Sequence, residues 1–426
     1  MHIDLAYGKT GLTIELPDEK VRDVLHMPKL PPVQNAGEAV RGVLVDPVGS
    51  PPLTELARAC DTACIVVSDI TRPVPNDVVL EPMLQVLVEA GMAPQDILIL
   101  VATGLHRPNT EAELREMLGP RVMSSGCRIE NHEARDTGAH IRVGATRQGT
   151  EAFVDGRYLA VDLEILTGLV EPHLMAGFSG GRKSICPGTS SAETIMAFHR
   201  PELMEDPAGV AGNMQDNPVD LEACDVAGLS GGADFIVNVT LDEERNVTGV
   251  FGGGLFAAHH EAVQRARQQT TVTINEPADI VITTGGGYPL DLTFYQGIKG
   301  MVAAGPVVKD GGTVIIAQQN AEGIGGEEFQ QTLLESDDIH ELIREALDTG
   351  RREIDLWQVH KLELLLRRVE IFNYSTGVAH DLQQKLFVTP VASVEEAVAD
   401  CIEQYGPDAA IAVIPHGPYV LAQCND

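Results

Sequence analysis

A recurring unit constrains the fold of this chain most: a short run that is apolar at almost every position, then a glycine-rich or polar turn, then a helical pattern. The first runs are Cys64–Ser68 (CIVVS) and Asp96–Ala102 (DILILVA), and helical patterns follow at Val78–Ala90 and Glu111–Leu118. Continuously apolar strands are covered on both faces, as in parallel sheets. Because the predicted strands alternate with helices, the sequence predicts an α/β fold.

The length of the chain and a change in its pattern predict two domains. Its 426 residues exceed the roughly 250–300 residues that one hydrophobic core usually serves. The pattern becomes irregular in the middle and restarts after Asn275, with the apolar run Asp279–Thr284. We therefore predict two α/β domains with largely parallel sheets, residues 1–272 and 273–426. Whether the final strand, Ala409–Ile414, returns to the first domain is left open.

Two tight turns and a helix are predicted in the irregular middle. Asp155-Gly156 is the dipeptide typical of a hairpin turn, and a second hairpin is expected around Asp242–Asn246. The predicted helix His259–Gln269 then leads to the boundary. The adjacent residues His259 and His260 point to different faces of this helix, and both are interpreted as surface residues.

Polar loops follow four of the predicted strands. In open α/β sheets, ligands bind beyond the carboxyl ends of the strands. The four loops carry the sequences DITRP, ATGLHRP, GLVEPH and TTGGGYP. Three belong to the first predicted domain and one to the second, so the sequence predicts an active-site cleft between the domains.

The charge and the cysteines argue against several classes of function. A formal net charge of -32 repels nucleic acids and anionic membrane surfaces, so we expect neither as a partner. The opening MHIDLAYGKTG lacks the regions of a secretory signal, and no apolar run reaches the roughly 20 residues that span a bilayer. None of the seven cysteines forms a CxxC pair, which argues against a zinc knuckle or a disulfide framework. We expect a cytoplasmic protein; the sequence does not specify its oligomeric state.

One loop, Glu171–Glu193 (EPHLMAGFSGGRKSICPGTSSAE), has neither helical nor strand periodicity and combines glycines with basic side chains. Glycines let the backbone approach a ligand, and such loops carry binding sites. The segment GFSGGRKS resembles a P-loop, but Arg182 stands where that motif requires glycine, and Cys186-Pro187-Gly188 interrupts the helix that should follow. A nucleoside triphosphatase is therefore disfavoured, although glycine amides beside Arg182 and Lys183 still suit a phosphate.

Lys183 and three histidines are the first candidates for chemistry. Lysines are usually solvated, but Lys183 lies in an apolar, glycine-rich segment, where it can pair with phosphate or react as an amine. His106 (TGLHRP) and His173 (VEPHLM) follow predicted strand ends, and His199 (AFHRP) closes a short helix. A single histidine of this kind is more often structural, but three on converging loops indicate acid–base catalysis or metal ligation.

Further candidates lie beside the same loops. Arg72 follows an apolar strand in DITRP and is interpreted as an anion-binding residue rather than a surface ion-pair partner. Lys299 lies in the predicted helix YQGIKG, in which Tyr295 and Gln296 could equally serve packing. Trp357, the single tryptophan, is expected to be a core or interface anchor rather than a cofactor contact.

Taken in order, the motifs DITRP, ATGLHRP, EPHLMAGFSGGRKSICPG, FHRP and YQGIKG resemble those of the nickel-dependent lactate racemase family. The resemblance extends over most of the chain and includes the two-domain division. It implies the nickel-pincer nucleotide as cofactor, a pyridinium-3-thioamide-5-thiocarboxylic acid mononucleotide whose nickel is held by two sulfurs, a ring carbon and a protein histidine. Separate enzymes make this cofactor, so the resemblance also implies maturation enzymes as partners.

The resemblance gives each matched residue a role. Lys183 would carry the cofactor covalently, and His199 would be the nickel ligand. His106 and His173 would be the catalytic acid–base pair, one for each enantiomer of the substrate. The other assignments are substrate binding by Arg72, Lys299, Tyr295 and Gln296, and cofactor binding by Asp69, Gly180, Gly181 and Arg182.

The resemblance thus implies an isomerase, a racemase or epimerase of a 2-hydroxy acid such as lactate. Hydride would leave carbon 2 for the cofactor while a base takes the hydroxyl proton, giving a 2-ketoacid whose other face then receives the hydride. Imidazole suits this role because its ordinary pKa of roughly 6.5 lets it accept and donate protons near neutrality. Two alternatives stay open: the same chemistry on malate or a sugar acid, and a nucleotide- or phosphate-binding enzyme without redox chemistry.

Overall fold

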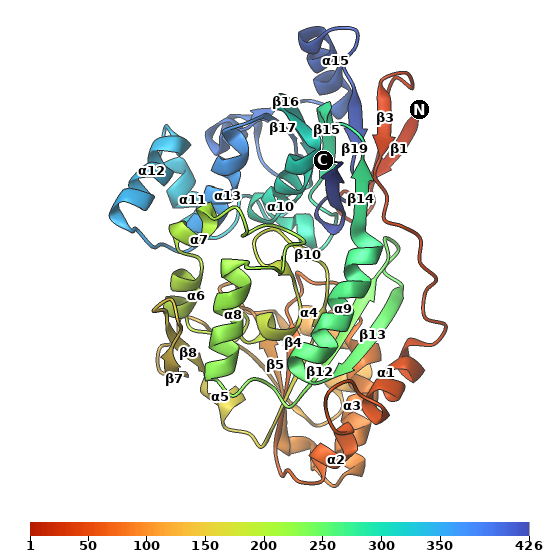
Figure 1. Cartoon of the computed structure of the whole chain (residues 1–426), viewed down its shortest axis with the longest axis vertical. Coiled ribbons are helices and arrows are strands. Elements are labelled where there is room, and N and C mark those ends of the chain that lie inside the picture. Colours follow the sequence, from red (N-terminus) through yellow and green to blue (C-terminus); the bar gives the residue numbers. More distant parts are fainter. Residues whose placement is uncertain (426) are drawn as a thin grey trace.

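The structure, a computed structural model, describes residues 1–425 and consists of two α/β units arranged along the long axis of the molecule (Figure 1). Each unit has a six-stranded, largely parallel sheet, so the predicted fold class is confirmed. Within the described residues, no helix has both the length and the apolarity needed to cross a bilayer.

The first sheet has the strand order β13-β12-β9-β4-β5-β6, in which all neighbours are parallel except the hairpin β12–β13. Its strands are β4 (Ala63–Ser68), β5 (Ile97–Ala102), β6 (Arg128–Asn131), β9 (Leu163–Leu169), β12 (Phe235–Leu241) and β13 (Val247–Gly253). Strand β4 explains the apolar run in its sequence, because Ile65 and Val67 pack into the core on one face while Cys64 and Val66 pack into the core on the other.

Helices cover both faces of this sheet. One core contains residues of α1, α3 and α4, and the other contains residues of α8 and α9. Their bounds are α1 (Ala36–Val45), α3 (Asn76–Glu89), α4 (Glu111–Met123), α8 (Pro218–Leu229) and α9 (Leu255–Thr270). The loops at the carboxyl ends of β4, β5 and β9 are left uncovered by these helices and face the second unit.

The second sheet is parallel throughout, with the order β18-β17-β16-β15-β19-β3. Its strands are β3 (Val21–Val24), β15 (Ala278–Thr284), β16 (Val308–Ala317), β17 (Glu370–Tyr374), β18 (Thr389–Pro390) and β19 (Ile411–Val413). The helices on one face are α10 (Phe294–Ala304), α11 (Glu327–Leu334), α12 (Ile339–Thr349) and α13 (Leu356–Leu366), and α15 (Val394–Tyr405) lies on the other.

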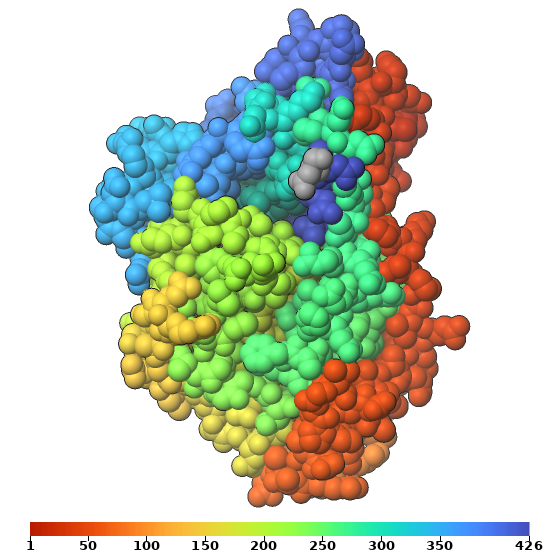
Figure 2. All heavy atoms as spheres, viewed as in Figure 1, coloured from red at the N-terminus to blue at the C-terminus, as the bar shows by residue number. Residues whose placement is uncertain are grey.

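The start of the chain belongs with the second unit. Strand β3 pairs with β19, and the hairpin of β1 (His2–Leu5) and β2 (Leu12–Glu15) packs into a core of the same sheet. The predicted division at residue 272 assigned these residues to the first domain, which the strand pairing corrects. The final predicted strand, 409–414, contains β19 and stays in the second sheet. Between β3 and α1 the chain passes along one side of both units, as the red spheres in Figure 2 show.

One of the two predicted hairpin turns is wrong. The turn at Asp242–Asn246 joins β12 to β13 as predicted. The Asp155-Gly156 pair instead begins a short helix, because the Asp155 carboxylate accepts a hydrogen bond from the main-chain N–H of Arg157. An aspartate is as well suited to the start of a helix as to a turn, and the dipeptide does not distinguish them.

A glycine brings helix α10 against the sheet of the second unit. A Cβ atom on Gly300 would lie 2.0 Å from the Thr284 carbonyl oxygen at the end of β15, so a side chain does not fit there. The close approach holds the neighbouring residue Lys299, and the start of α10, at the edge that faces the first unit.

Candidate functional site

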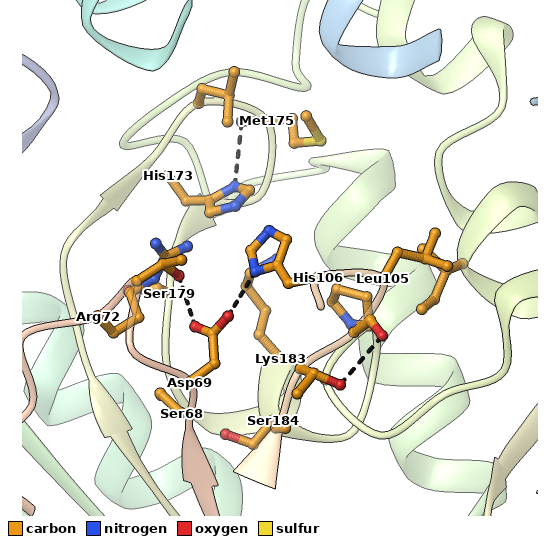
Figure 3. A pocket seen from close by; sticks show the side chains of 18 of the residues that line it. Ser68, Asp69, Arg72, Leu105, His106, His173, Met175, Ser179, Lys183 and Ser184 are labelled. Atoms are coloured by element: carbon orange, nitrogen blue, oxygen red, sulfur yellow. Dashed lines mark hydrogen bonds and ion pairs between the residues drawn. The ribbon is translucent and has the colours of Figure 1, made fainter. Parts of the chain in front are cut away.

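The strand-end loops of the first unit and helix α10 of the second enclose a cavity of about 150 Å³. Figure 3 shows side chains from several of these loops converging on it. Nine of the predicted site residues line this cavity: Asp69, Arg72, His106, His173, Gly180, Lys183, His199, Tyr295 and Lys299. The sequence prediction of a cleft between the two units therefore corresponds to one continuous site.

The two ring nitrogens of His106 are held in different forms, Nδ1 as a hydrogen-bond donor and Nε2 as an acceptor. Its Nδ1 donates a hydrogen bond to the Asp69 carboxylate at 2.6 Å, and Thr71 donates to the other oxygen of that carboxylate at 2.6 Å (Figure 3). Burial raises the pKa of Asp69, but His106 and the two hydrogen bonds outweigh burial and hold this pKa below its ordinary value, so Asp69 stays ionised. The Gln296 amide donates to His106 Nε2 at 3.3 Å, which identifies Nε2 as the acceptor.

His173 is held in the opposite form. Its Nδ1 accepts hydrogen bonds from the main-chain N–H groups of Ala176 at 3.2 Å and Met175 at 3.4 Å, so the proton of the neutral ring resides on Nε2. Burial lowers the pKa of His173 well below its ordinary value, and the nearby charges of Lys183 and Lys299 lower it further. The two histidines therefore offer an acceptor and a donor to the same cavity.

Among the described residues, the Lys183 amine has no hydrogen-bond or ion-pair partner, and it lies 5.8 Å from the centre of the Phe198 ring. Lys183 lies in a short 3₁₀ turn, Gly181–Ser184, that begins after Gly180 at a positive φ of 78°. A Cβ on Gly180 would lie 2.7 Å from the Val170 side chain, so the sharp turn requires glycine. Burial lowers the pKa of Lys183 to about 7, and the charges of Arg182 and Arg72 contribute. A large fraction of this amine is therefore neutral and nucleophilic at physiological pH.

His199 is held as a neutral ring with Nδ1 as the hydrogen-bond donor. It lies at the end of α6 (Ala192–Phe198), and its Nδ1 donates to the Ile195 carbonyl at 2.8 Å, which leaves Nε2 for ligation. Burial lowers its pKa to about 3, so the ring is neutral, as ligation requires. The ring stacks on Trp357 at 4.3 Å between centroids and an angle of 24°. Trp357 is buried, as expected, but it also lines the cavity, which its sequence context did not predict.

Two cations lie at the opposite wall of the cavity. Arg72 Nε is 3.2 Å from Glu171 Oε1, and Glu171 Oε2 is a buried oxygen without a hydrogen-bond partner among the described residues. Lys299 donates to the Gln296 side-chain oxygen, which turns the amide of Gln296 toward His106. Burial lowers the pKa of Lys299 well below its ordinary value, and the charge of Arg72 adds to this effect. An anion between Arg72 and Lys299 would stabilise both charged forms.

Arg182 is the predicted cofactor-binding residue that the structure places elsewhere. Its guanidinium is buried, pairs with Asp220, and donates to the carbonyl oxygens of Gly180 and Ala176. It is not among the residues that line the cavity. A predicted role in phosphate binding is corrected to a structural one, in which Arg182 fixes the turn that carries Lys183.

The prediction that His259 lies on the surface is also wrong, because His259 is buried. Its Nε2 lies 2.9 Å from the Ser179 carbonyl oxygen and 3.1 Å from Arg182 Nη1. Its ring lies 2.8 Å from the position that a Cβ on Gly181 would occupy, so Gly181 is required by packing and does not line the cavity. His260, the next residue, is exposed as predicted.

Sequence reasoning missed several residues of the site, and four of them have contacts or positions that bear on its chemistry. Glu171 pairs with Arg72, and Trp357 stacks on His199 and donates its indole N–H to the Tyr295 hydroxyl at 3.1 Å. Asp355 and Gln358 also line the cavity. Glu171 is the first residue of the motif EPHLM, and its place in a strand-end loop could have identified it as a site residue. The other three residues follow no predicted strand.

A second, larger cavity adjoins the first. It has a volume of about 570 Å³ and shares Arg72, His173, Leu174 and Lys299 with the first cavity. Its remaining wall is largely apolar, with the side chains of Val210, Leu290, Val302, Leu364, Leu365 and Val420.

Comparisons with known proteins match the whole chain to one family. The lactate racemase N-terminal domain matches residues 7–212, and the lactate racemase C-terminal domain matches residues 273–422. A lactate racemase of Thermoanaerobacterium thermosaccharolyticum is 33% identical and one of Lactiplantibacillus plantarum is 34% identical, each over 99% of both chains. The chain therefore belongs to the lactate racemase family.

Solved structures agree with this assignment. The apoprotein of the Thermoanaerobacterium thermosaccharolyticum lactate racemase superposes with a TM-score of 0.91 at 31% identity, over 99% of this chain and 100% of the other. A protein from Thermotoga maritima shares the fold, with a TM-score of 0.71 at 17% identity over 93% of this chain and all of the other.

The environment of Lys183 predicts an unusual titration. After reductive methylation with ¹³C-formaldehyde, the NMR signal of Lys183 should titrate near pH 7, whereas an ordinary lysine titrates near pH 10.4. The Lys183→Ala variant should lack this signal, and Lys309→Ala, which removes a half-exposed lysine, should retain it. A Lys183 signal that titrates only above about pH 9 would contradict the described burial.

Proposed function

We propose that this member of the lactate racemase family interconverts the enantiomers of a 2-hydroxy acid, lactate among them, with a nickel-pincer nucleotide carried on Lys183. The observation that supports the proposal most is the convergence of an acceptor imidazole, a donor imidazole, a neutral amine and two cations on one cavity. A nucleotide- or phosphate-binding enzyme without redox chemistry is less well supported, because the guanidinium of Arg182 is committed to Asp220.

The residues present suit that cofactor. A largely neutral Lys183 amine can form an amide with a carboxyl-type group of the nucleotide. Among the described residues, no group of three metal-binding side chains surrounds this cavity, and the neutral His199 alone cannot hold a metal. A metal at His199 therefore needs further ligands from a bound molecule, which the sulfur atoms of the cofactor would provide. When bound, the cofactor supplies a centre that accepts hydride from carbon 2 of the substrate and returns it.

Side chains of the second unit and the first would bind the substrate carboxylate together. Arg72 from the β4 loop and Lys299 from α10 face the same space, and their charged forms gain stability when an anion lies between them. Gln296 links Lys299 to His106, so the carboxylate and the hydroxyl of the substrate would be held in a fixed relation. Tyr295 and Trp357, whose indole N–H donates to the Tyr295 hydroxyl, also line this cavity.

The two histidines would move the hydroxyl proton. His106 Nε2 accepts the proton of one enantiomer, and the ionised Asp69 carboxylate stabilises the imidazolium that forms. His173 presents Nε2–H to the same cavity, so it would donate a hydrogen bond to the oxygen of the ketoacid after that molecule has turned, and as an imidazolium it would return the hydroxyl proton to that oxygen. Carbon 2 would invert because hydride returns to the other face of the turned ketoacid, while the histidines move only the hydroxyl proton.

The larger cavity indicates which substituents on carbon 2 of the substrate can be bound. The larger cavity opens behind Arg72, His173 and Lys299, and its wall is mainly apolar. We infer that an aliphatic substituent longer than the methyl group of lactate fits there. The second carboxylate of malate or the hydroxyls of a sugar acid would fit less well, because the basic side chains on that wall, Arg267, Lys361 and Arg368, already donate to other groups of the protein.

The proposed activity is tested by supplying loaded enzyme with single enantiomers. Protein co-expressed with the maturation enzymes, and shown by mass to carry the cofactor, should racemise lactate and 2-hydroxyhexanoate, and should act on malate more slowly. Chiral chromatography of the products measures this. Absence of turnover on every 2-hydroxy acid by fully loaded protein would overturn the proposal, and a preference for malate would overturn the inference from the larger cavity.

The two histidines are tested by substitution. His106→Gln and His173→Gln should each lower kcat by about 10²–10⁴-fold, because each removes one proton-transfer group. His260→Gln, on the exposed face of α9, should keep the rate of the unaltered enzyme. Cofactor content by intact mass should be equal in all three proteins. Wild-type turnover by either His106→Gln or His173→Gln would remove that residue from the mechanism.

A further inference from the structure

A second cluster of metal-binding side chains lies away from the substrate cavity, where the two units meet. His26 follows β3 on the segment that leads from the second unit to the first. Glu243 lies in the turn between β12 and β13 of the first unit, and His416 follows β19 of the second. None of the three lines the cavity that contains Lys183. Three segments far apart in the sequence thus meet at one point.

The distances between the side chains suit a single ion. His26 Nδ1 is 3.1 Å and His416 Nε2 is 3.6 Å from the same oxygen, Glu243 Oε2. One ligand atom from each residue lies within 4.8 Å of the other two. Ligands of a tetrahedral ion with bonds of about 2.0–2.1 Å lie about 3.3 Å apart, so small side-chain movements bring all three to a zinc ion.

The carboxylate is already oriented for this role. Glu243 Oε1 accepts a hydrogen bond from the main-chain N–H of Met27 at 2.6 Å, which turns Oε2 toward the two imidazoles. Such a bond to the non-ligating oxygen is the outer contact that fixes metal-binding carboxylates. Two further charges act on His416: that of Glu244 favours a cation, and that of Arg245 opposes one, although Arg245 donates to the Tyr288 carbonyl.

The site is open on one side. The His26 side chain is 51% exposed, whereas that of Glu243 is 13% exposed, so an ion can enter from solvent and reach a largely buried carboxylate. Glu243 and His416 also line a cavity of about 160 Å³, which has room for a water molecule as a further ligand. Two histidines, one carboxylate and an open position are a common ligand set of zinc.

We propose that His26, Glu243 and His416 bind one divalent transition metal, for which Zn²⁺ is the best match, and that this metal links the two units. The cofactor site draws residues from both units, so the metal would stabilise the arrangement that completes it. Metal bound there also stabilises the folded chain by mass action, because the unfolded chain does not hold the three ligands together.

The test uses the full-length protein without cofactor, in the His199→Ala background, so that ligation by His199 does not contribute. Titration with Zn²⁺ against a chromogenic chelator should reveal one tight equivalent, and Zn²⁺ should raise the melting temperature. Co²⁺ in its place should give the visible absorption of a four- or five-coordinate ion. His26→Asn, Glu243→Gln and His416→Asn should each lower the affinity for Zn²⁺ at least about tenfold and abolish the rise in melting temperature.

An exposed carboxylate outside the cluster serves as the control. Glu261→Gln removes an exposed carboxylate of α9 and should bind Zn²⁺ as the background protein does. Circular dichroism shows which variants fold, and any two of the three ligand variants suffice for the comparison. Absence of a tight equivalent in the background protein, or equal affinity in all folded ligand variants, would overturn the proposal.

Discussion

Three basic side chains, Arg72, Lys183 and Lys299, line one cavity in which burial opposes the charge of the two lysines, and the properties of the site depend on that arrangement. The charge of Arg72 lowers the pKa of both lysines, and Lys183 lowers that of Lys299. The same three cations lower the pKa of His173. In a chain with a formal net charge of -32, this cluster of basic side chains favours the binding of an anion. A substrate carboxylate between Arg72 and Lys299 would stabilise their charged forms, and an amide at Lys183 would remove one basic group from the cluster.

The fold makes this arrangement possible by dividing the site between two units. The first unit contributes both histidines, Arg72 and Lys183 from loops after its strands, where parallel sheets leave ligand sites. The second contributes Lys299 from α10, and the absence of a side chain at Gly300 lets that helix lie against β15. Arg182 belongs to the same scheme, because its buried pair with Asp220 fixes the turn that presents Lys183. Displacing one unit from the other would separate Lys299 and Gln296 from Arg72, Lys183 and His106.

Much of the fold and of the site could be predicted from the sequence, because both follow from local patterns. Continuously apolar strands such as β4 and β5 indicate a parallel sheet, and the strand-end loops name most of the residues that line the cavity. Arg182 was misassigned because its partner, Asp220, lies 38 residues away and no local pattern reveals the ion pair. His259 was misplaced for a similar reason: its partner Ser179 lies 80 residues away. The membership of β3 in the second sheet could not be predicted, because its partner β19 lies near the other end of the chain.

The central claim is that the site transfers the hydrogen of carbon 2 as hydride while the histidines handle only the hydroxyl proton. Lactate deuterated at carbon 2 tests this directly when the loaded enzyme racemises it in ordinary water. The account predicts that the inverted product keeps its deuterium, because that hydrogen never becomes an exchangeable proton. Loss of deuterium to solvent in step with racemisation would show that a histidine removes the carbon-bound proton, and would contradict the proposed roles of His106 and His173.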